Sequence, residues 1–208
     1  MFTGIIQAKG NIKEIRISNK GAVFALNSNS LELSDVSIGD SIAVNGVCLT
    51  ITQLDKNSFS ADVSQETLNC TTFSQLRKGQ NINLEKSLRL DQGIDGHLVS
   101  GHVDGVGEVV SLQKEGESTR LKIKVKNDLS KYIAKKGSIC INGVSLTVNS
   151  VEADIFDVNI VPHTLSVTTL GELIENSRVN IEIDIIARHI EHLIRHKSTT
   201  GIDITTPK

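Results

Sequence analysis

Apolar and polar residues alternate with a period of two in a stretch near the middle of the first half of the chain. In SIAVNGVCLTI (41–51), Asn45-Gly46 separates two apolar runs, and after it Val47, Leu49 and Ile51 fall on one face of an extended strand. Asparagine and glycine both tolerate the positive φ angles that the two central positions of a tight hairpin turn require. The pattern therefore predicts a β-hairpin.

The same pattern returns 97 residues later. SICINGVSLTV (138–148) repeats the hairpin, HTLSVTT (163–169) repeats ETLNCTT (66–72), and VNIE (179–182) repeats INLE (82–85). Several matching blocks in one register indicate a duplication, whereas a solenoid would show shorter and more numerous repeats. We therefore expect two similar domains, 1–97 and 98–185, joined near the turn-rich DQGIDG (91–96), and a separate segment 186–208.

Each half is expected to be mainly β. Short apolar strands, glycine-rich turns and the lack of alternating long helices favour a small antiparallel barrel. Short helices are expected at 66–70, 129–135 and 163–167. In the last segment, Ile186, Ile190, Leu193 and Ile194 recur at helical spacing, which predicts a terminal helix with an apolar stripe. The pattern leaves open whether this stripe self-associates or packs on its own barrel.

Composition excludes several function classes. The 208 residues include 22 basic and 24 acidic ones, and a net charge of -2 gives no field to recruit nucleic acid or anionic lipid. We expect no membrane span and no secretory signal, because no apolar run approaches ~20 residues and the start lacks a basic segment. Three cysteines without a C-x-x-C pair indicate a reducing, cytoplasmic location.

The two halves differ at a few polar positions, and these differences suggest chemistry. If both halves bind the same ligand and only one performs a given chemical step, functional groups are expected to be exchanged between equivalent positions. The exchanged pairs are Cys48 and Ser145, Ile5 and His102, Glu66 and His163, and Asp62 and Asn159.

Each candidate also has a structural interpretation. A cysteine on a strand is often a small buried filler, and Ser145 has no histidine partner at a spacing that suggests activation. His97 and His102 lie five residues apart, but no third or fourth ligand with convincing spacing completes a metal site. Asp184, after the strand VNIEI, also fits a residue that ends a strand.

Longer motifs carry a resemblance to a known family. The start MFTGII, the twin blocks VNGVCLT and INGVSLT, the segment GHLVSGHVDG, and IVPHTLSVTTLG with VNIEID resemble the riboflavin synthase family from Met1 to about Leu193. The resemblance implies two homologous six-stranded Greek-key barrels and a C-terminal helix that gathers three subunits into a homotrimer. It implies the dismutation of two 6,7-dimethyl-8-ribityllumazine molecules, with no metal and no cofactor. Some members of the family also associate with lumazine synthase.

The resemblance further implies sites where the first barrel of one subunit faces the second barrel of another. For one lumazine it implies contacts with Gly4, Ile5, Ile6, Ser145, Leu146, Thr147, Asn159, Ile160, Val161, Pro162, His163 and Thr164. For the other it implies contacts with Cys48, Leu49, Thr50, Asp62, Val63, Ser64, Gln65, Glu66, Thr67, Gly101, His102, Val103 and Lys136, with Phe2 covering the site.

Roles within these sites are expectations. His102 is the first candidate for proton transfer, because imidazole titrates near working pH. Cys48 and Ser145 are expected to polarise a ring or position water, Cys48 also being a possible nucleophile, and Asp184 to assist near Ser145. Thr50 and Thr147 would bind the ring edge, and Asp62 and Asn159 the ribityl hydroxyls.

Two rival functions stay open at this point. One is a non-catalytic lumazine or flavin carrier on the same double barrel, which is expected to lose catalytic side chains and keep binding ones. The other is a flavin-binding reductase, which needs a nicotinamide domain with a G-x-G-x-x-G loop between a strand and a helix. The sequence has no such loop in that setting.

Overall fold

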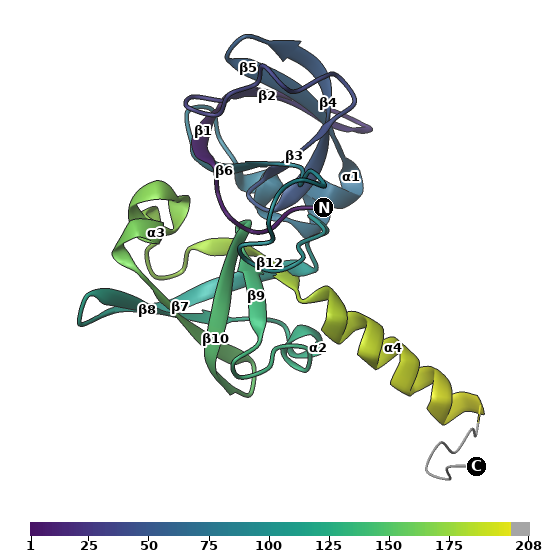
Figure 1. Ribbon diagram of the computed structural model, residues 1–208, viewed down its shortest axis with the longest axis vertical. Coiled ribbons are helices and arrows are strands. Elements are labelled where there is room, and N and C mark those ends of the chain that lie inside the picture. The colour runs from purple at the N-terminus through teal and green to yellow at the C-terminus, as the bar shows by residue number, and fades with distance from the viewer. Residues whose placement is uncertain (201–208) are drawn as a thin grey trace.

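The chain folds into two closed antiparallel barrels of six strands each, followed by a helix (Figure 1). The computed structural model describes residues 1–200, except for the side chains of Asn127 and of residues 196–200. The first barrel contains β1 (Ala8–Ser18), β2 (Gly21–Asn27), β3 (Ser41–Val44), β4 (Val47–Asp55), β5 (Ser58–Ser64) and β6 (Asn81–Lys86), with α1 (Gln65–Cys70) and η1 (Thr72–Gln75).

The second barrel repeats this order. It contains β7 (Gly105–Glu115), β8 (Ser118–Lys124), β9 (Ser138–Ile141), β10 (Val144–Glu152), β11 (Ile155–Ile160) and β12 (Arg178–Ile183), with α2 (Asn127–Ser130), α3 (Pro162–Val167) and η2 (Thr169–Glu172). The strands of the first barrel close in the order β1-β2-β5-β4-β3-β6, and the second barrel has the equivalent order. Pairing of β2 with β5 rather than with β3 makes each barrel a Greek key, as the sequence resemblance implies.

The predicted hairpins are confirmed. Asn45 and Gly46 have φ angles of 45° and 78°, and Asn142 and Gly143 have 47° and 84°, so both turn positions of each hairpin are left-handed. After the first turn, alternate residues of β4 enter a core that also contains the edge-to-face pair Phe24–Phe73, with ring centroids 5.1 Å apart. A separate core of aliphatic residues around Phe156 fills the second barrel.

Buried asparagines join the two barrels. Asn83 donates from Nδ2 to the carbonyl of Asn142 (2.8 Å), and Asn180 donates in the same way to the carbonyl of Asn45 (2.8 Å). Asn83 and Asn180 are equivalent residues of the two repeats and are almost completely buried. Because each bond is matched by its counterpart, the barrels are related by a local twofold arrangement, and buried satisfied amides hold it in place.

One predicted helix is wrong. Residues 129–135 do not form a helix, because α2 ends at Ser130 and the chain continues in turns. Tyr132 and Ile133 donate from their backbone amides to the carbonyls of Leu129 and Ser130, which are three-residue turn bonds. Lys136 then takes a φ of 66°, which ends any helical path before β9. The helices expected at 66–70 and 163–167 are confirmed as α1 and α3.

The C-terminal helix α4 (Ile185–Thr200) projects away from the second barrel (Figure 1). Glu191 accepts from Lys131 Nζ (2.6 Å) and from Tyr132 Oη, and these bonds lower the pKa of Glu191 to about 2. The apolar stripe points elsewhere: Ile186, Ile190, Leu193 and Ile194 are each more than half exposed. Packing of the stripe on its own barrel is therefore not observed.

Among residues 1–200, no helix is long and apolar enough to cross a membrane. The end of the tail, residues 201–208, lies outside the described residues.

Candidate active site

The first candidate site lies on the outer face of β4. Cys48 is half-buried there and Thr50 is exposed. The backbone amide of Cys48 donates to the carbonyl of Gly101 (2.8 Å), and Val103 packs against the core of the first barrel. The loop before the second barrel thus returns to the first barrel and brings the backbone of Gly101, which the exposed His102 follows in the chain, against Cys48.

The second candidate site repeats this geometry. The backbone amide of Ser145, on β10, donates to the carbonyl of Gly4 (2.8 Å), and Ile6 packs against the core of the second barrel. The N-terminal segment therefore crosses to the second barrel, as the loop at Gly101 crosses to the first. The structure brings together the groups that the sequence resemblance associates: Gly4–Ile6 with Ser145, and Gly101–Val103 with Cys48.

Two buried glutamates fix the crossing segments. Glu182 accepts from the backbone amides of Ser100 (2.7 Å) and Gly101 (3.0 Å) and from Ser100 Oγ (2.5 Å). Glu85, its counterpart, accepts from the amide and hydroxyl of Thr3 and from the amide of Gly4. Burial raises the pKa of Glu85, and these hydrogen bonds oppose the rise.

Glycine is required at both crossings. Gly4 and Gly101 have φ angles of 76° and 80°, which L side chains rarely adopt. A Cβ at Gly101 would lie 2.6 Å from Cys48 Cβ, and one at Gly4 would lie 2.6 Å from Ser145 Cβ. Both contacts are far shorter than van der Waals distance, so the close approach of each segment to its strand depends on glycine.

His97 is a site residue that the sequence analysis did not assign. Its Nδ1 lies 2.6 Å from Ser145 Oγ, although 48 residues separate the two in the chain. Its buried Nε2 has no hydrogen-bond partner among the described residues. Burial lowers the pKa of His97, and the charge of Asp184 opposes this. A neutral imidazole is therefore available to accept the Ser145 proton or to orient the hydroxyl.

Asp184 also begins α4. Its side-chain Oδ1 accepts from the amide of Ile186 (2.9 Å), and its carbonyl accepts from Ala187 (3.0 Å). The negative charge of Asp184 raises the pKa of His97 and so opposes the effect of burial, while assistance by Asp184 near Ser145 stays a prediction. Ser145 and His97 are in direct contact, and Asp184 stands at the start of α4.

For the other expected residues, the burial of each side chain decides what it could contact. Leu49, Val63 and Ile160 point into the cores, so only their backbone could face a ligand. The exposed or half-buried residues of the first site are Asp62, Ser64, Gln65, Glu66 and Thr67. Those of the second site are Ile5, Leu146, Thr147, Asn159, Val161, Pro162, His163 and Thr164.

The surroundings of Phe2 and Lys136 differ from those of the other expected residues. The side chain of Phe2 is fully buried with Val99 and Cys140, and a Cβ at Gly101 would lie 2.9 Å from its ring, so that covering of a site by Phe2 stays a prediction. Lys136 lies on the second barrel, where its amide donates to Val148 (2.8 Å), and so within one chain it neighbours the Ser145 strand rather than Cys48. Within the described part of the chain, no group of three or more side chains is placed to hold a metal ion.

Comparison with known proteins assigns the chain to a family. The sequence model of the lumazine binding domain matches residues 3–87 and 100–184, once for each barrel. Riboflavin synthase from Photobacterium leiognathi is 47% identical over 195 residues, which cover 94% of this chain and 89% of that protein. The chain belongs to the riboflavin synthase family. The riboflavin synthases from Brucella abortus and Bacillus subtilis are 41% and 38% identical to this chain. Each match spans 95% of this chain, and the matches cover 100% of the Brucella abortus protein and 91% of the Bacillus subtilis protein.

Solved structures give a second comparison. The structure of LumP complexed with 6,7-dimethyl-8-(1'-D-ribityl) lumazine has a TM-score of 0.78 and 30% identity to this riboflavin synthase family member, and covers 88% of this chain and 99% of LumP. The LumP complex with riboflavin has a TM-score of 0.79 at the same identity and coverage. The riboflavin synthases are the more similar in sequence, and the chain is an enzyme of this transferase family.

Proposed function

We propose that the protein makes riboflavin from two molecules of 6,7-dimethyl-8-ribityllumazine. A four-carbon unit moves from one lumazine to the other, and the second product is 5-amino-6-(D-ribitylamino)uracil. One observation carries the proposal: the two barrels present sites built to the same plan, yet Cys48 and His102 at one are replaced by Ser145 and Ile5 at the other. Such a pair suits two identical substrates with different chemical roles.

The duplication serves the rate of the reaction. Two copies of one substrate must meet in a single orientation, and binding each on its own barrel removes the entropic cost of a bimolecular encounter. Prior positioning of this kind lowers the activation free energy by on the order of 7–11 kcal/mol. One lumazine loses the carbon unit that the other gains, so the balance of the reaction needs no added oxidant or cofactor.

Proton transfer falls to the polar side chains of the two sites. We assign His102 to proton transfer at the 7-methyl group of one lumazine, beside Cys48, which polarises the ring or positions water. At the other site, Ser145 faces the substrate and His97 holds or accepts its proton, under the influence of Asp184. Thr50 and Thr147 contact the ring edges, and Asp62 and Asn159 are exposed to bind ribityl hydroxyls.

The two half-sites are proposed to meet across subunits. Each lies on the outside of its barrel, where a partner's barrel can face it. The exposed stripe Ile186–Ile194 on α4 supports a homotrimer held together by this helix, since an apolar surface of this kind favours association. A cytoplasmic location and association with lumazine synthase stay predictions.

A non-catalytic carrier of lumazine or flavin is the less favoured function. The chain is 30% identical to LumP but 47% identical to a riboflavin synthase. It also retains Cys48, His102, Ser145 and Asp184, which a carrier has no reason to keep.

The test is incubation of the purified protein with 6,7-dimethyl-8-ribityllumazine alone, without metal or nicotinamide. Riboflavin formation is followed by absorbance and fluorescence. Cys48→Ser and His102→Gln are the matched variants: both are expected to bind lumazine, and both to turn it over more slowly. Tight binding by the wild-type protein without riboflavin formation would overturn the proposal in favour of a carrier.

A further inference from the structure

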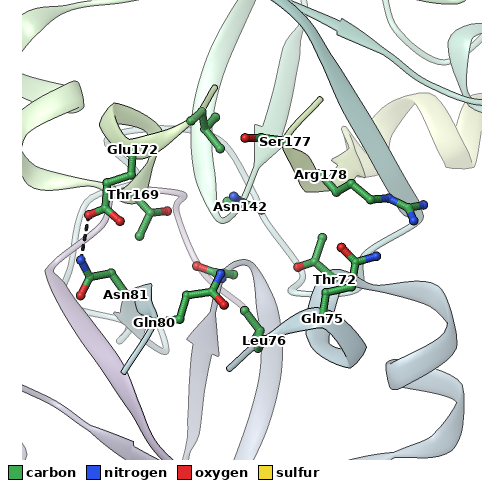
Figure 2. Close-up of a pocket in the computed structure, with 12 residues that line it drawn as sticks. Thr72, Gln75, Leu76, Gln80, Asn81, Asn142, Thr169, Glu172, Ser177 and Arg178 are labelled. Atoms are coloured by element: carbon green, nitrogen blue, oxygen red, sulfur yellow. Dashed lines mark hydrogen bonds between the residues drawn. The ribbon is translucent and has the colours of Figure 1, made fainter. Parts of the chain in front are cut away.

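A polar cleft of about 270 Å³ lies between the two barrels (Figure 2). Its walls come from both hairpin turns, from η1 and η2, and from the first residues of β6 and β12. None of the residues assigned above to the candidate active site lines it. The volume corresponds to roughly nine water molecules, at about 30 Å³ each, and suits a ligand smaller than a flavin.

The cleft is rich in hydrogen-bond donors, because the protein itself occupies several of the acceptor atoms. Oδ1 of Asn45 accepts from the amide of Asn83 (2.8 Å), and Oδ1 of Asn142 accepts from the amide of Asn180 (2.8 Å). The NH₂ groups of both turn asparagines are left for the cleft that they line.

Two further lining residues follow the same rule. Gln80 Oε1 accepts from the amide of Arg77 (3.1 Å), and Ser177 Oγ accepts from the amide of Ile174 (3.0 Å). Gln80 and Ser177 are equivalent positions of the two repeats, and each keeps a donor for a ligand, an NH₂ group in one case and a hydroxyl hydrogen in the other. Four side chains of the cleft therefore offer hydrogen-bond donors, which suit a ligand with hydrogen-bond acceptors.

An unpaired buried hydroxyl adds a second observation. Thr169 is only 7% exposed and lines the cleft, and its Oγ1 has no hydrogen-bond partner within residues 1–200. Its backbone amide is already bound to Asn83 Oδ1 (2.7 Å), which fixes the residue in place. A buried hydroxyl without a partner is unfavourable unless a bound group supplies one.

Charge in the cleft is unequal at its two ends, where Figure 2 shows Glu172 and Arg178 with Asn142 between them. Glu172 has partners of its own within the chain, since it accepts from Asn81 Nδ2 (2.9 Å) and lies 3.9 Å from Lys9 Nζ. Arg178 makes no ion pair with any residue of the described chain. Its counterpart in the first repeat is Asn81, so the second copy has a cation that the first lacks.

We propose that this cleft binds a small oxyanion, a phosphate or a carboxylate group. Arg178 supplies the positive charge at the rim, and the hydroxyl and amide donors along the cleft hold the oxygens, as charge-assisted hydrogen bonds favour. The bonds from Asn83 and Asn180 fix the floor before any ligand arrives. The inference does not rest on the proposed reaction, because the cleft shares no residue with the candidate active site.

The experiment is calorimetric titration of the full chain with inorganic phosphate and, separately, with malonate, while glycerol serves as a neutral control. Arg178→Gln removes the charge and Thr169→Val removes the hydroxyl at nearly constant volume. Arg16→Gln is the matched control, since Arg16 is an exposed arginine that does not line the cleft. Lumazine binding is measured in parallel to show that each variant is folded.

One oxyanion bound per chain is expected, weakened about tenfold or more by Arg178→Gln and a few-fold by Thr169→Val, with Arg16→Gln unchanged. The tighter of the two probes identifies the phosphate or carboxylate class. The proposal is overturned if neither probe binds, if glycerol binds equally well, or if binding is insensitive to both cleft variants.

Discussion

The contact between His97 and Ser145 allows a sharp prediction. In His97→Ala the hydroxyl of Ser145 loses the nitrogen that lies 2.6 Å away. In His97→Asn the shorter amide reaches about as far as Nδ1, so a hydrogen bond to Ser145 is retained while a titratable base is lost. The two variants therefore separate positioning of the hydroxyl from proton transfer.

The magnitudes of the two effects differ. Loss of one hydrogen bond to a half-buried hydroxyl costs about 1–3 kcal/mol, or roughly 5- to 150-fold in kcat. Loss of a general base costs about 10²–10⁴-fold. If His97 acts as the base, both variants fall by the larger factor. If it only positions Ser145, His97→Asn stays near wild type and His97→Ala falls by the smaller one.

The assay is steady-state riboflavin formation at several pH values, with lumazine binding measured separately so that KM and kcat are distinguished.

Because burial lowers the pKa of His97 below its usual 6.5, the imidazole is neutral at pH 7 and charges only under more acidic conditions. Stability from the buried neutral ring is thus present above about pH 6.5 and is lost as the pH falls. His97→Asn should remove this loss in urea unfolding at fixed protein concentration. Wild-type kcat in both variants would refute the role given to His97.

Three further predictions follow from the geometry. Gly101→Ala should destabilise the fold and reduce turnover more than Gly39→Ala. Both glycines have a positive φ, but only at Gly101 would the added Cβ meet a neighbour, Cys48 Cβ at 2.6 Å. The midpoints of urea unfolding compare the two variants, and equal losses of stability would contradict the steric argument. Ile190→Glu should convert the proposed homotrimer to monomers in sedimentation, since it places a charge in the exposed stripe. A wild-type protein that sediments as a monomer, or an unchanged mass of the variant, would contradict α4 as the interface. Glu191→Gln should weaken the contact of α4 with Lys131 and Tyr132 at neutral pH. In the wild-type protein, with a Glu191 pKa of about 2, this contact is present above about pH 4.5 and is lost as the pH falls toward 2. Hydrogen exchange of the α4 amides measures both effects, and equal protection in variant and wild type at neutral pH would contradict the prediction.

Local pattern was enough to predict two similar antiparallel barrels, because the duplicated blocks carry their own turn chemistry, whereas the six strands and the Greek-key order came from the family resemblance. Asn45-Gly46 and Asn142-Gly143 specify the hairpins through φ angles that few other residues tolerate. The helix expected at 129–135 failed for a local reason as well, since three-residue turns and the left-handed Lys136 replace it. This short segment forms irregular turns where the sequence analysis predicted a helix.

The site was only partly accessible from sequence. Exchanges between equivalent positions indicated Cys48, Ser145 and His102, but His97 was missed because its partner lies 48 residues away. Contacts of this range depend on the crossing of the segment after residue 95 toward Ser145, which no local pattern shows. The available signal was the position of His97 at the start of a glycine-rich loop. The full burial of Phe2 between the barrels was hidden for the same reason.

The stoichiometry of turnover tests the central claim most directly. Purified protein is given a known amount of 6,7-dimethyl-8-ribityllumazine and the reaction is followed to completion, with riboflavin and the pyrimidine product quantified by chromatography. The account predicts one riboflavin and one pyrimidine for every two lumazines consumed, with no added cofactor. Lumazine that is bound and recovered unchanged would contradict it.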